Sequence, residues 1–558
     1  MKIPIDVGMY WVNKMEKSKT IHLEKPNTLS DFLTSEERQN IVSLKITGFI
    51  GHKDFDDVLD DMCDVYGLYD DDDNWMPDYN ESAAIRHLDL GEATYVDGDN
   101  LPYFGCHAQL ETFILPKGIK STLDGEEFGT GISESEMLKT LVLPEGLKSV
   151  GGFHSCPNLK DVILPEGLEE IGWKAFAGCT AITSIRIPAS VRWFFGNSFA
   201  GCKIKAYEVD SENPYFTAVD GVVYSKDLTT LVAFPSAYPH ERYVVPETTR
   251  IIEKSAFEDS CISDVELPIG LTSIKDYVFQ GSNIRKIELP DTVTELGELV
   301  FRFCNNLEHI RLSNGLSTIP RQTFSRCPKL KSLEIPSSVK RIYYSAIAWS
   351  DGLEQLKLND GLEEIVDEGP MLGVNGGLRE VNLPKTLKKV PGGVFNYSPF
   401  IKEFCLDPEN PYFSIIDSAL CSKDGKTIYS VPDYHKCSYD VPEGIEAIAE
   451  RAFAFLPELH TIGLPSTLRT IECRAFQGCE SLTRIQIPAG VTKVHIDAFM
   501  SNGLKDIVME SAVPPKMTGI LKDNEWRYRK VNLLVPAEAV TAYQQAPGWK
   551  SFNVKTNE

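Results

Sequence analysis

A repeat constrains the fold of this chain more than any other feature. The segment over residues 159–179, LKDVILPEGLEEIGWKAFAGC, has a second version that starts 23 residues later and covers residues 182–202. Each version has apolar residues at its first, fourth and sixth positions, then a proline, then a second apolar patch that ends in Phe-x-Gly-Cys. One such unit is too small to bury its own apolar side, so neighbouring units must stack. The repeat predicts a β-solenoid of about 17 rungs of 22–23 residues, although a length of 558 residues alone would suggest three or four domains.

The apolar triplet of each repeat predicts a β-strand that ends at a proline. Proline has no N–H to donate to a neighbouring strand, so it is typical of the place where a strand stops and the chain turns. A proline follows most of the predicted strand ends. These ends are Leu115, Leu143, Leu164, Ile187, Val245, Leu267, Leu289, Leu312, Ile335, Leu358, Leu383, Val441, Leu464 and Ile487.

A second column of the repeat is aromatic. Phenylalanines recur every 22 or 23 residues within three groups, which places them at one position of successive rungs. We expect this column to be a buried structural spine, because a stacked rung presents the same side chain to the same place in the core. The spine residues are Phe153, Phe176, Phe199, Phe257, Phe279, Phe301, Phe324, Phe453, Phe476 and Phe499.

Six of the 13 cysteines follow a spine phenylalanine by three residues and therefore form a column of their own. Neighbouring rungs lie near the Cα separation that a disulfide needs, so bridged pairs are one interpretation. Buried free thiols are the interpretation that the sequence favours. The column consists of Cys156, Cys179, Cys202, Cys304, Cys327 and Cys479.

Two longer units, near residues 207–240 and 404–437, interrupt the period. They carry the duplicate segments DSENPYF at 210–216 and DPENPYF at 407–413, which are 197 residues apart. Asp-Gly pairs within both units are a turn signal of β-hairpins. We therefore expect hairpins built into the solenoid at both places.

Residues 1–80 are predicted to form an N-terminal cap, residues 81–510 the repeat solenoid and residues 511–558 a C-terminal cap. A solenoid needs caps because its first and last rungs would otherwise expose core and strand edges. In the C-terminal cap we expect a last strand over 531–535 and a helix over 537–545.

The N-terminal cap has its own local signals. Ser30 or Ser35 is expected to cap a short helix before a strand near 42–46, and apolar spacing predicts an acidic helix over 54–66. The loop at 70–73 is four consecutive aspartates. It lacks the alternating spacing of a known calcium loop, so a solvated tip is the favoured interpretation.

The charge of the chain excludes some partners. Fifty-six basic residues stand against 80 acidic ones, for a net charge of −24, which repels a nucleic-acid backbone. No run of 18 apolar residues is present, so we expect no membrane-spanning segment. Residues 1–10 contain Asp6 where a signal peptide needs an apolar core. A cytoplasmic location therefore stays open, as does prior removal of a leader.

Sequence patterns of catalytic and metal sites are absent. The chain has no Cys-x-x-Cys, no HExxH, no G-x-S-x-G, no Walker loop and no G-x-G-x-x-G that opens a helix. We predict no catalytic residue, no cofactor and no metal site.

The outward face of the predicted strands is the surface most open to a ligand. Period-two alternation turns Ile114, Val142 and Ile163 outward on three successive rungs, beside Arg186, and an exposed apolar patch often marks a contact site. These four residues are the candidate ligand contacts. Cover by the N-terminal cap, or by the insert at 121–136, is the alternative. Further along, the outward column alternates in charge, as in a ladder of exposed ion pairs.

The repeat, the ENPYF units and the ending VPAEAVTAYQQAPGW at 535–549 together resemble the BspA-like leucine-rich repeat proteins of bacteria, over roughly residues 85–550. The resemblance implies a leucine-rich repeat solenoid that is secreted or displayed at the cell surface, with adhesion to host matrix proteins in some members.

We expect a non-enzymatic ligand-binding or adhesion module for a protein or a glycan, possessing an extended binding face. One alternative is an enzyme that acts on polysaccharide through Glu266 and Glu288, because carboxylates on adjacent rungs could approach the separation of about 5 Å that retaining glycosidases use. Another alternative is an intracellular protein scaffold.

Overall fold

The computed structural model of this chain describes residues 17–63, 67–69, 75–77, 84–102, 110–123, 130–343, 345–366, 377–396, 398, 400–432, 435–501, 503–519 and 528–557. The chain divides into two compact units. Unit 1 comprises residues 1–241 and 252–262, and unit 2 comprises 242–251 and 263–558. The predicted acidic loop at 70–73 lies outside the described residues, as does part of the insert at 121–136.

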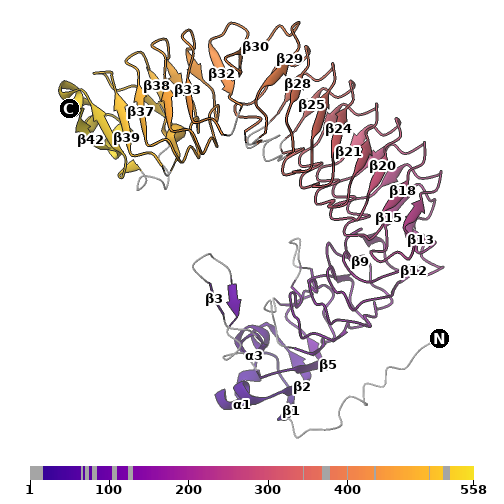
Figure 1. Ribbon diagram of the computed structural model, residues 1–558. Coiled ribbons are helices and arrows are strands. Elements are labelled where there is room, and N and C mark those ends of the chain that lie inside the picture. Colours follow the sequence, from indigo (N-terminus) through magenta and orange to yellow (C-terminus); the bar gives the residue numbers. More distant parts are fainter. Residues whose placement is uncertain are drawn as a thin grey trace. The chain divides into compact units, whose positions relative to one another are not determined.

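Each rung of unit 2 is one turn of a coil with three parts (Figure 1). A strand such as β18 (Asp264–Glu266) leads into a proline turn, a short strand such as β19 (Ser273–Ile274) follows, and a further turn carries the spine residue, here Phe279. The proline turn closes with a hydrogen bond in which the Leu271 N–H donates to the Pro268 carbonyl at 3.0 Å. Both strands pair in parallel with their counterparts in the next rung, β18 with β20 and β19 with β21. The predicted β-solenoid is therefore confirmed.

The first strands of the rungs in unit 2 form four parallel ladders, β16–β18–β20–β22, β24–β26–β28–β29, β33–β35 and β37–β39–β41–β42. Their remaining bounds are β16 (Arg242–Val244), β20 (Lys286–Glu288), β22 (His309–Arg311), β24 (Ser332–Ile335), β26 (Gln355–Leu358), β28 (Val381–Leu383), β29 (Phe404–Leu406), β33 (Ser438–Asp440), β35 (Thr461–Gly463), β37 (Arg484–Ile487), β39 (Asp506–Met509), β41 (Asn532–Val535) and β42 (Asn553–Thr556). The second strands are β17 (Ile251–Ile252), β21 (Glu295–Leu296), β23 (Thr318–Ile319), β25 (Arg341–Ile342), β27 (Glu364–Ile365), β34 (Ala447–Ile448), β36 (Thr470–Ile471), β38 (Lys493–His495) and β40 (Lys516–Thr518).

Unit 1 begins with a parallel sheet of order β1–β2–β5–β6–β7, so the segment predicted as an N-terminal cap adds two strands to the sheet of the first rungs. Its strands are β1 (Ser18–Leu23), β2 (Ser43–Ile50), β5 (His87–Tyr95), β6 (Thr112–Ile114) and β7 (Thr140–Val142). Smaller pairings involve β3 (Gly67–Tyr69) with β4 (Trp75–Pro77), β8 (Ser149–Val150) and β11 (Trp193–Phe194) with β9 (Glu170–Ile171), and β10 (Ile185–Ile187) with β12 (Tyr207–Val209).

One predicted strand is missing from unit 1. Residues 162–164 are not a strand, although Val162 and Leu164 are buried as the pattern requires. Asp161 has a left-handed backbone (φ 55°), which breaks the extended path at the point where the strand would begin. The side chains keep their places in the core while the ladder is interrupted.

The helices of unit 1 are short. Helix α1 (Ser35–Asn40) is capped by Thr34 rather than by either predicted serine, because Thr34 and Glu37 form a reciprocal capping box. A 3-10 turn, η2 (Leu29–Phe32), precedes it. The predicted acidic helix is present as α2 (His52–Asp54), a π turn η3 (Phe55–Leu59) and α3 (Asp60–Cys63). None of the helices in the described part of the chain combines the length and the apolarity of a bilayer-spanning segment.

All ten predicted spine phenylalanines are buried. Six neighbouring pairs stack face to face, with ring centroids from 5.3 Å (Phe176 and Phe199) to 5.9 Å (Phe476 and Phe499) apart. Phe234, which the sequence pattern did not select, stacks on Phe257 at 4.5 Å. The glycine of Phe-x-Gly-Cys is explained by the backbone, since Gly178 has a left-handed conformation with φ 76°.

The six column cysteines are buried free thiols. Each donates its S–H to a backbone carbonyl of the rung before it, as Cys179 does to Phe153 (3.0 Å), Cys304 to Phe279 (3.0 Å) and Cys479 to Phe453 (3.1 Å). Burial raises the pKa of the Cys479 thiol to about 12, which keeps the proton that this bond needs. The column is a hydrogen-bonded ladder and not a set of disulfides.

The two longer units contain the predicted hairpins. In the first, Asp220-Gly221 joins two antiparallel strands with left-handed φ values of 51° and 76°; in the second, Asp417-Ser418 takes that place. The strands are β13 (Phe216–Val219), β14 (Val222–Ser225) and β15 (Thr230–Ala233), and β30 (Phe413–Ile416), β31 (Ala419–Ser422) and β32 (Thr427–Ser430).

A buried asparagine anchors each longer unit to the rung before it. The side-chain oxygen of Asn410 accepts from the N–H groups of Tyr412 (2.8 Å) and Phe413 (2.9 Å). Its amide donates to the carbonyls of Pro384 (2.9 Å) and Leu387 (3.0 Å). Asn213 makes the same four bonds in the first unit. The asparagine of the ENPYF segment thus links the hairpin to the preceding rung of the solenoid by hydrogen bonds.

The C-terminal segment has the predicted strand and helix, and then one more strand. The elements are η4 (Ile496–Phe499), β41 (Asn532–Val535), η5 (Ala537–Ala539), α5 (Val540–Gln545), η6 (Trp549–Ser551) and β42 (Asn553–Thr556). Because β42 pairs in parallel with β41, the helix does not end the chain's sheet, and the prediction that 531–535 is the last strand is wrong.

Candidate ligand-binding surface

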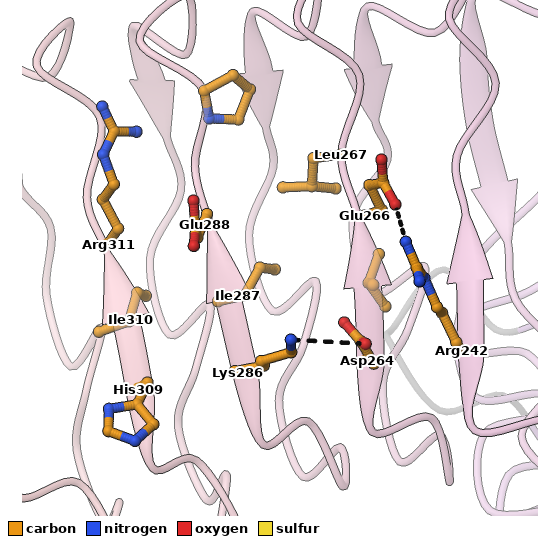
Figure 2. Close-up of a pocket in the computed structure, with 12 residues that line it drawn as sticks. Arg242, Asp264, Glu266, Leu267, Lys286, Ile287, Glu288, His309, Ile310 and Arg311 are labelled. Atoms are coloured by element: carbon orange, nitrogen blue, oxygen red, sulfur yellow. Dashed lines mark hydrogen bonds and ion pairs between the residues drawn. The ribbon is translucent and has the colours of Figure 1, made fainter.

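An open depression of about 680 Å³ lies on unit 2 over the strands β16, β18, β20 and β22. Each of these three-residue strands turns its central side chain inward, so that Tyr243, Val265 and Ile287 are buried. The first and third side chains point outward, as Figure 2 shows for most of them. We call these eight residues the β16–β22 face: Arg242, Val244, Asp264, Glu266, Lys286, Glu288, His309 and Arg311.

The β16–β22 face mixes charges of both signs. The parallel register sets Asp264 between Arg242 and Lys286, and Glu288 opposite Arg311. Three cations and three anions therefore balance on this face, although the whole chain has a net charge of −24. Such a face is not the basic patch that a phosphate backbone requires.

Two ion pairs occupy one side of the face (Figure 2). The Arg242 guanidinium contacts the Glu266 carboxylate, which raises the pKa of Arg242. Lys286 Nζ lies 3.9 Å from Asp264 Oδ2. Exposed pairs such as these fix side-chain positions more than they stabilise the fold.

Arg311 turns away from its register partner. Its Nη2 lies 2.8 Å from Asp291 Oδ1, and its Nη1 donates to the Leu289 carbonyl at 2.9 Å. Hydrogen bonds from the backbone and side chain of Asn314, together with Arg311, lower the pKa of Asp291. The Glu288 carboxylate is left without a hydrogen bond or ion pair to any described residue.

His309 is the second group of the face with free bonding capacity. It is exposed on β22, opposite Lys286, and its imidazole makes no hydrogen bond or ion pair with the described residues. Glu288 offers acceptor oxygens, while the imidazole can donate and accept. An acceptor and a donor thus stand on adjacent strands, between groups that are already paired.

The predicted ladder of cross-strand ion pairs is present only in part. Lys357 and Glu334 lie opposite each other on β26 and β24 and pair at 2.7 Å, as expected. At the β16–β22 face, the sequence reasoning followed the third residue of each strand and missed the column of first residues, to which Arg242 and His309 belong. The same alternation, read two residues earlier, would have found them.

Glu266 and Glu288, the carboxylates of the polysaccharide-acting enzyme hypothesis, lie on the β16–β22 face. Glu266 is ion-paired with Arg242, and its side chain is 55% exposed. Glu288 is also exposed. Neither is enclosed with the other in a cavity.

The early-rung candidates lie in unit 1. Ile114 and Val142 are opposite each other on β6 and β7, and both are half-buried; Ile114 packs over Gly91. Ile163 is 59% exposed but lies outside any strand. Arg186 is exposed on β10, where it pairs with Glu166 (2.8 Å) and contacts Asp210.

The repeat pattern decides the family. Six copies of the BspA-type leucine-rich repeat region match residues 103–218, 232–354, 319–424 and 434–519, which is more than half of the chain. This chain belongs to the BspA-type leucine-rich repeat family. The resemblance inferred from the ENPYF and Phe-x-Gly-Cys motifs is confirmed.

Solved structures of leucine-rich repeat proteins are similar to this BspA-type chain at low identity. A leucine-rich repeat protein from Eubacterium ventriosum is 18% identical, with 75% of this chain and 82% of that protein covered and a TM-score of 0.34. A leucine-rich cell surface protein from Faecalibacterium prausnitzii is 18% identical over 57% and 98% of the two chains, with a TM-score of 0.43. The pneumococcal vaccine antigen PcpA is 18% identical over 62% and 88%, with a TM-score of 0.33. No curated protein sequence matches this chain.

Proposed function

We propose that this chain is a non-enzymatic binding module, and that its β16–β22 face binds a protein partner. The observation that carries the proposal is the pair of groups with free bonding capacity, Glu288 and His309, inside a depression that spans four strands. Charge patterns of this kind give a protein interface its register and specificity.

The shape of the depression supports a macromolecule over a small molecule. Small-molecule sites are enclosed and lined mostly by apolar groups. This depression is open, and charged side chains supply most of its outward groups. The two carboxylates of the enzyme alternative, Glu266 and Glu288, are exposed rather than enclosed, which favours binding over hydrolysis of a glycosidic bond.

We place the binding at the cell surface, as an adhesion function, from the family to which the chain belongs. Brief protease treatment of intact cells tests this location. Loss of the chain while a cytoplasmic marker survives supports display, whereas full protection until lysis would favour an intracellular scaffold.

The function is tested by screening the purified chain against arrayed matrix proteins and glycans. The variant Lys286→Ala/Glu288→Ala/His309→Ala should weaken a protein hit by about 10-fold to 100-fold, as loss of central interface groups does. Its control is Glu334→Ala/Lys357→Ala, which removes an exposed ion pair of the same solenoid. Circular dichroism confirms that each variant is folded.

A third variant separates the two candidate surfaces. Ile114→Ser/Val142→Ser/Ile163→Ser alters the early-rung residues in unit 1. If this variant no longer binds the screened molecule while the β16–β22 variant still does, the assignment of the binding site to the β16–β22 face is wrong. If the chain binds only glycans, the proposal of a protein partner is wrong.

A further inference from the structure

Three metal-ligating side chains meet in unit 2 at a place where the sequence shows no metal motif. Cys473 follows β36, His495 ends β38, and Asp497 lies in the 3-10 turn η4. One donor atom of each, a sulfur, a ring nitrogen and a carboxylate oxygen, all lie within 4.8 Å of one another, and all three residues are half-buried. Their separations of 22 and 24 residues are one repeat period, so the stacking of two rungs brings them together.

The surroundings hold two of these side chains in position. His495 Nδ1 accepts a hydrogen bond from the Asp497 N–H at 3.1 Å. The buried Tyr528 hydroxyl lies 3.2 Å from Asp497 Oδ1 and 3.1 Å from the Ile496 carbonyl. The Tyr528 bond to Asp497 is of the kind that orients a carboxylate ligand in metal sites, whereas a metal on His495 Nδ1 would take the place of the Asp497 N–H.

The backbone of the next rung makes room for the imidazole ring. Gly519 lies so close that a Cβ there would be 2.8 Å from His495 Nε2 and Cε1. Beside it, the buried Thr518 Oγ1 has no hydrogen-bond partner in the described part of the chain. Glycine at this position therefore leaves space for the ring.

No hydrogen bond joins the donor atoms of the three side chains to one another in the described residues, so they do not form a relay of the Cys–His–Asp kind. Three electron-pair donors that face one another without a shared proton are suited to a cation.

We propose that Cys473, His495 and Asp497 form a binding site for a divalent transition metal of the zinc class. Thiolate and imidazole ligands favour zinc, whereas calcium and magnesium prefer oxygen alone. Zinc bonds of about 2.0–2.3 Å require the distances between the donor atoms to shorten by about 1 Å. A metal bound to His495 Nδ1 replaces the hydrogen bond from the Asp497 N–H. The group has three described protein ligands, so water or a partner's side chain completes the shell.

Cobalt(II) titration of the reduced full-length chain tests the site, because cobalt bound to thiolate gives a near-ultraviolet charge-transfer band. We expect that band with one cobalt per chain, and its displacement by Zn²⁺. Cys473→Ser should abolish the band and weaken zinc binding at least 10-fold, and Asp497→Asn should weaken zinc binding. Cys261→Ser is the matched control, because Cys261 is exposed and lies in unit 1.

A wild-type measurement makes the test independent of variant folding. Zn²⁺ should protect Cys473 from alkylation, as read by mass spectrometry, while the exposed Cys261 stays reactive. Absence of the cobalt band, a band that survives in Cys473→Ser, or equal alkylation of Cys473 with and without Zn²⁺ would each overturn the proposal.

Discussion

Replacing Asn410 by aspartate should destabilise the second longer unit far more than the exchange of one NH₂ group for oxygen suggests. The Asn410 side chain is 1% exposed. Its amide donates to the carbonyls of Pro384 and Leu387, and its oxygen accepts from two N–H groups. Aspartate has the same shape and keeps the accepting oxygen. Its second oxygen, however, faces two carbonyl oxygens in place of a donor.

The magnitude follows from the bonds that are lost. Each buried hydrogen bond contributes about 1 kcal/mol, and a buried polar group left without its partner costs about 1–3 kcal/mol. The Pro384 carbonyl keeps the bond from the Leu387 N–H (3.2 Å), so only the Leu387 carbonyl is left without its donor. Two bonds lost and one carbonyl left unpaired give a loss of about 3–5 kcal/mol at neutral pH. Burial and the facing carbonyls also raise the pKa of the introduced carboxyl above its unfolded value. The loss should therefore shrink as pH falls, since the folded state then takes up a proton and regains one donor.

Hydrogen exchange read by mass spectrometry is the appropriate assay, because solenoids unfold locally and the loss belongs to one unit. Peptides from residues 404–432 should lose protection in Asn410→Asp, and the homologous change Asn213→Asp should do the same in the first unit. Asn305→Asp is the control, since Asn305 is exposed. The four-bond interpretation would be refuted if the free energy of exchange around both asparagines changed by less than about 0.5 kcal/mol, which is roughly the effect of a surface substitution.

Three further predictions concern the spine, a turn and a buried acid. Phe301→Ala should lower the free energy of unfolding by about 3–5 kcal/mol in urea titrations, because its ring stacks between two others at 5.4 and 5.6 Å; a loss below 1 kcal/mol would contradict the spine. Gly178→Ala should cost about 1–2 kcal/mol from its φ of 76° alone, since the nearest atom to the new Cβ is 3.4 Å away. Burial raises the pKa of Glu258 above its usual range, so wild-type stability should fall as pH rises through the folded value. Glu258→Gln should reduce this slope, to which the neighbouring Asp259 contributes because burial raises its pKa too, and should raise Tm at pH 7 in calorimetry.

The repeat allowed the solenoid to be predicted because its contacts are local. A spine residue such as Phe301 stacks on residues 22 and 23 positions away, so one period of sequence contains its whole environment. The burial of the column cysteines could be predicted for the same reason. The duplicated segment around Asn410 indicated hairpins, since both the turn residues and their spacing are written twice.

The failures lie where one residue departs from the period. Asp161 takes a left-handed backbone and interrupts a ladder whose apolar residues are all present. Arg311 bonds to Asp291 because a turn places that carboxylate within reach, and an outward alternation pattern says nothing about turns. The Cys473 cluster was missed because metal motifs are short local patterns, whereas its ligands come from two rungs.

The departures from the period also indicate where function can reside. Inward positions of a solenoid must repeat, because every rung has to fill the same cross-section of core. Outward positions are free of that demand, so a side chain there without a partner is not explained by packing. Glu288 and His309 satisfy this condition on the β16–β22 face. Cys473 departs from the period in another way: it follows β36 at a turn, and its sulfur lies within 4.8 Å of donor atoms of His495 and Asp497 on the next rung, a juxtaposition that packing of the core does not require.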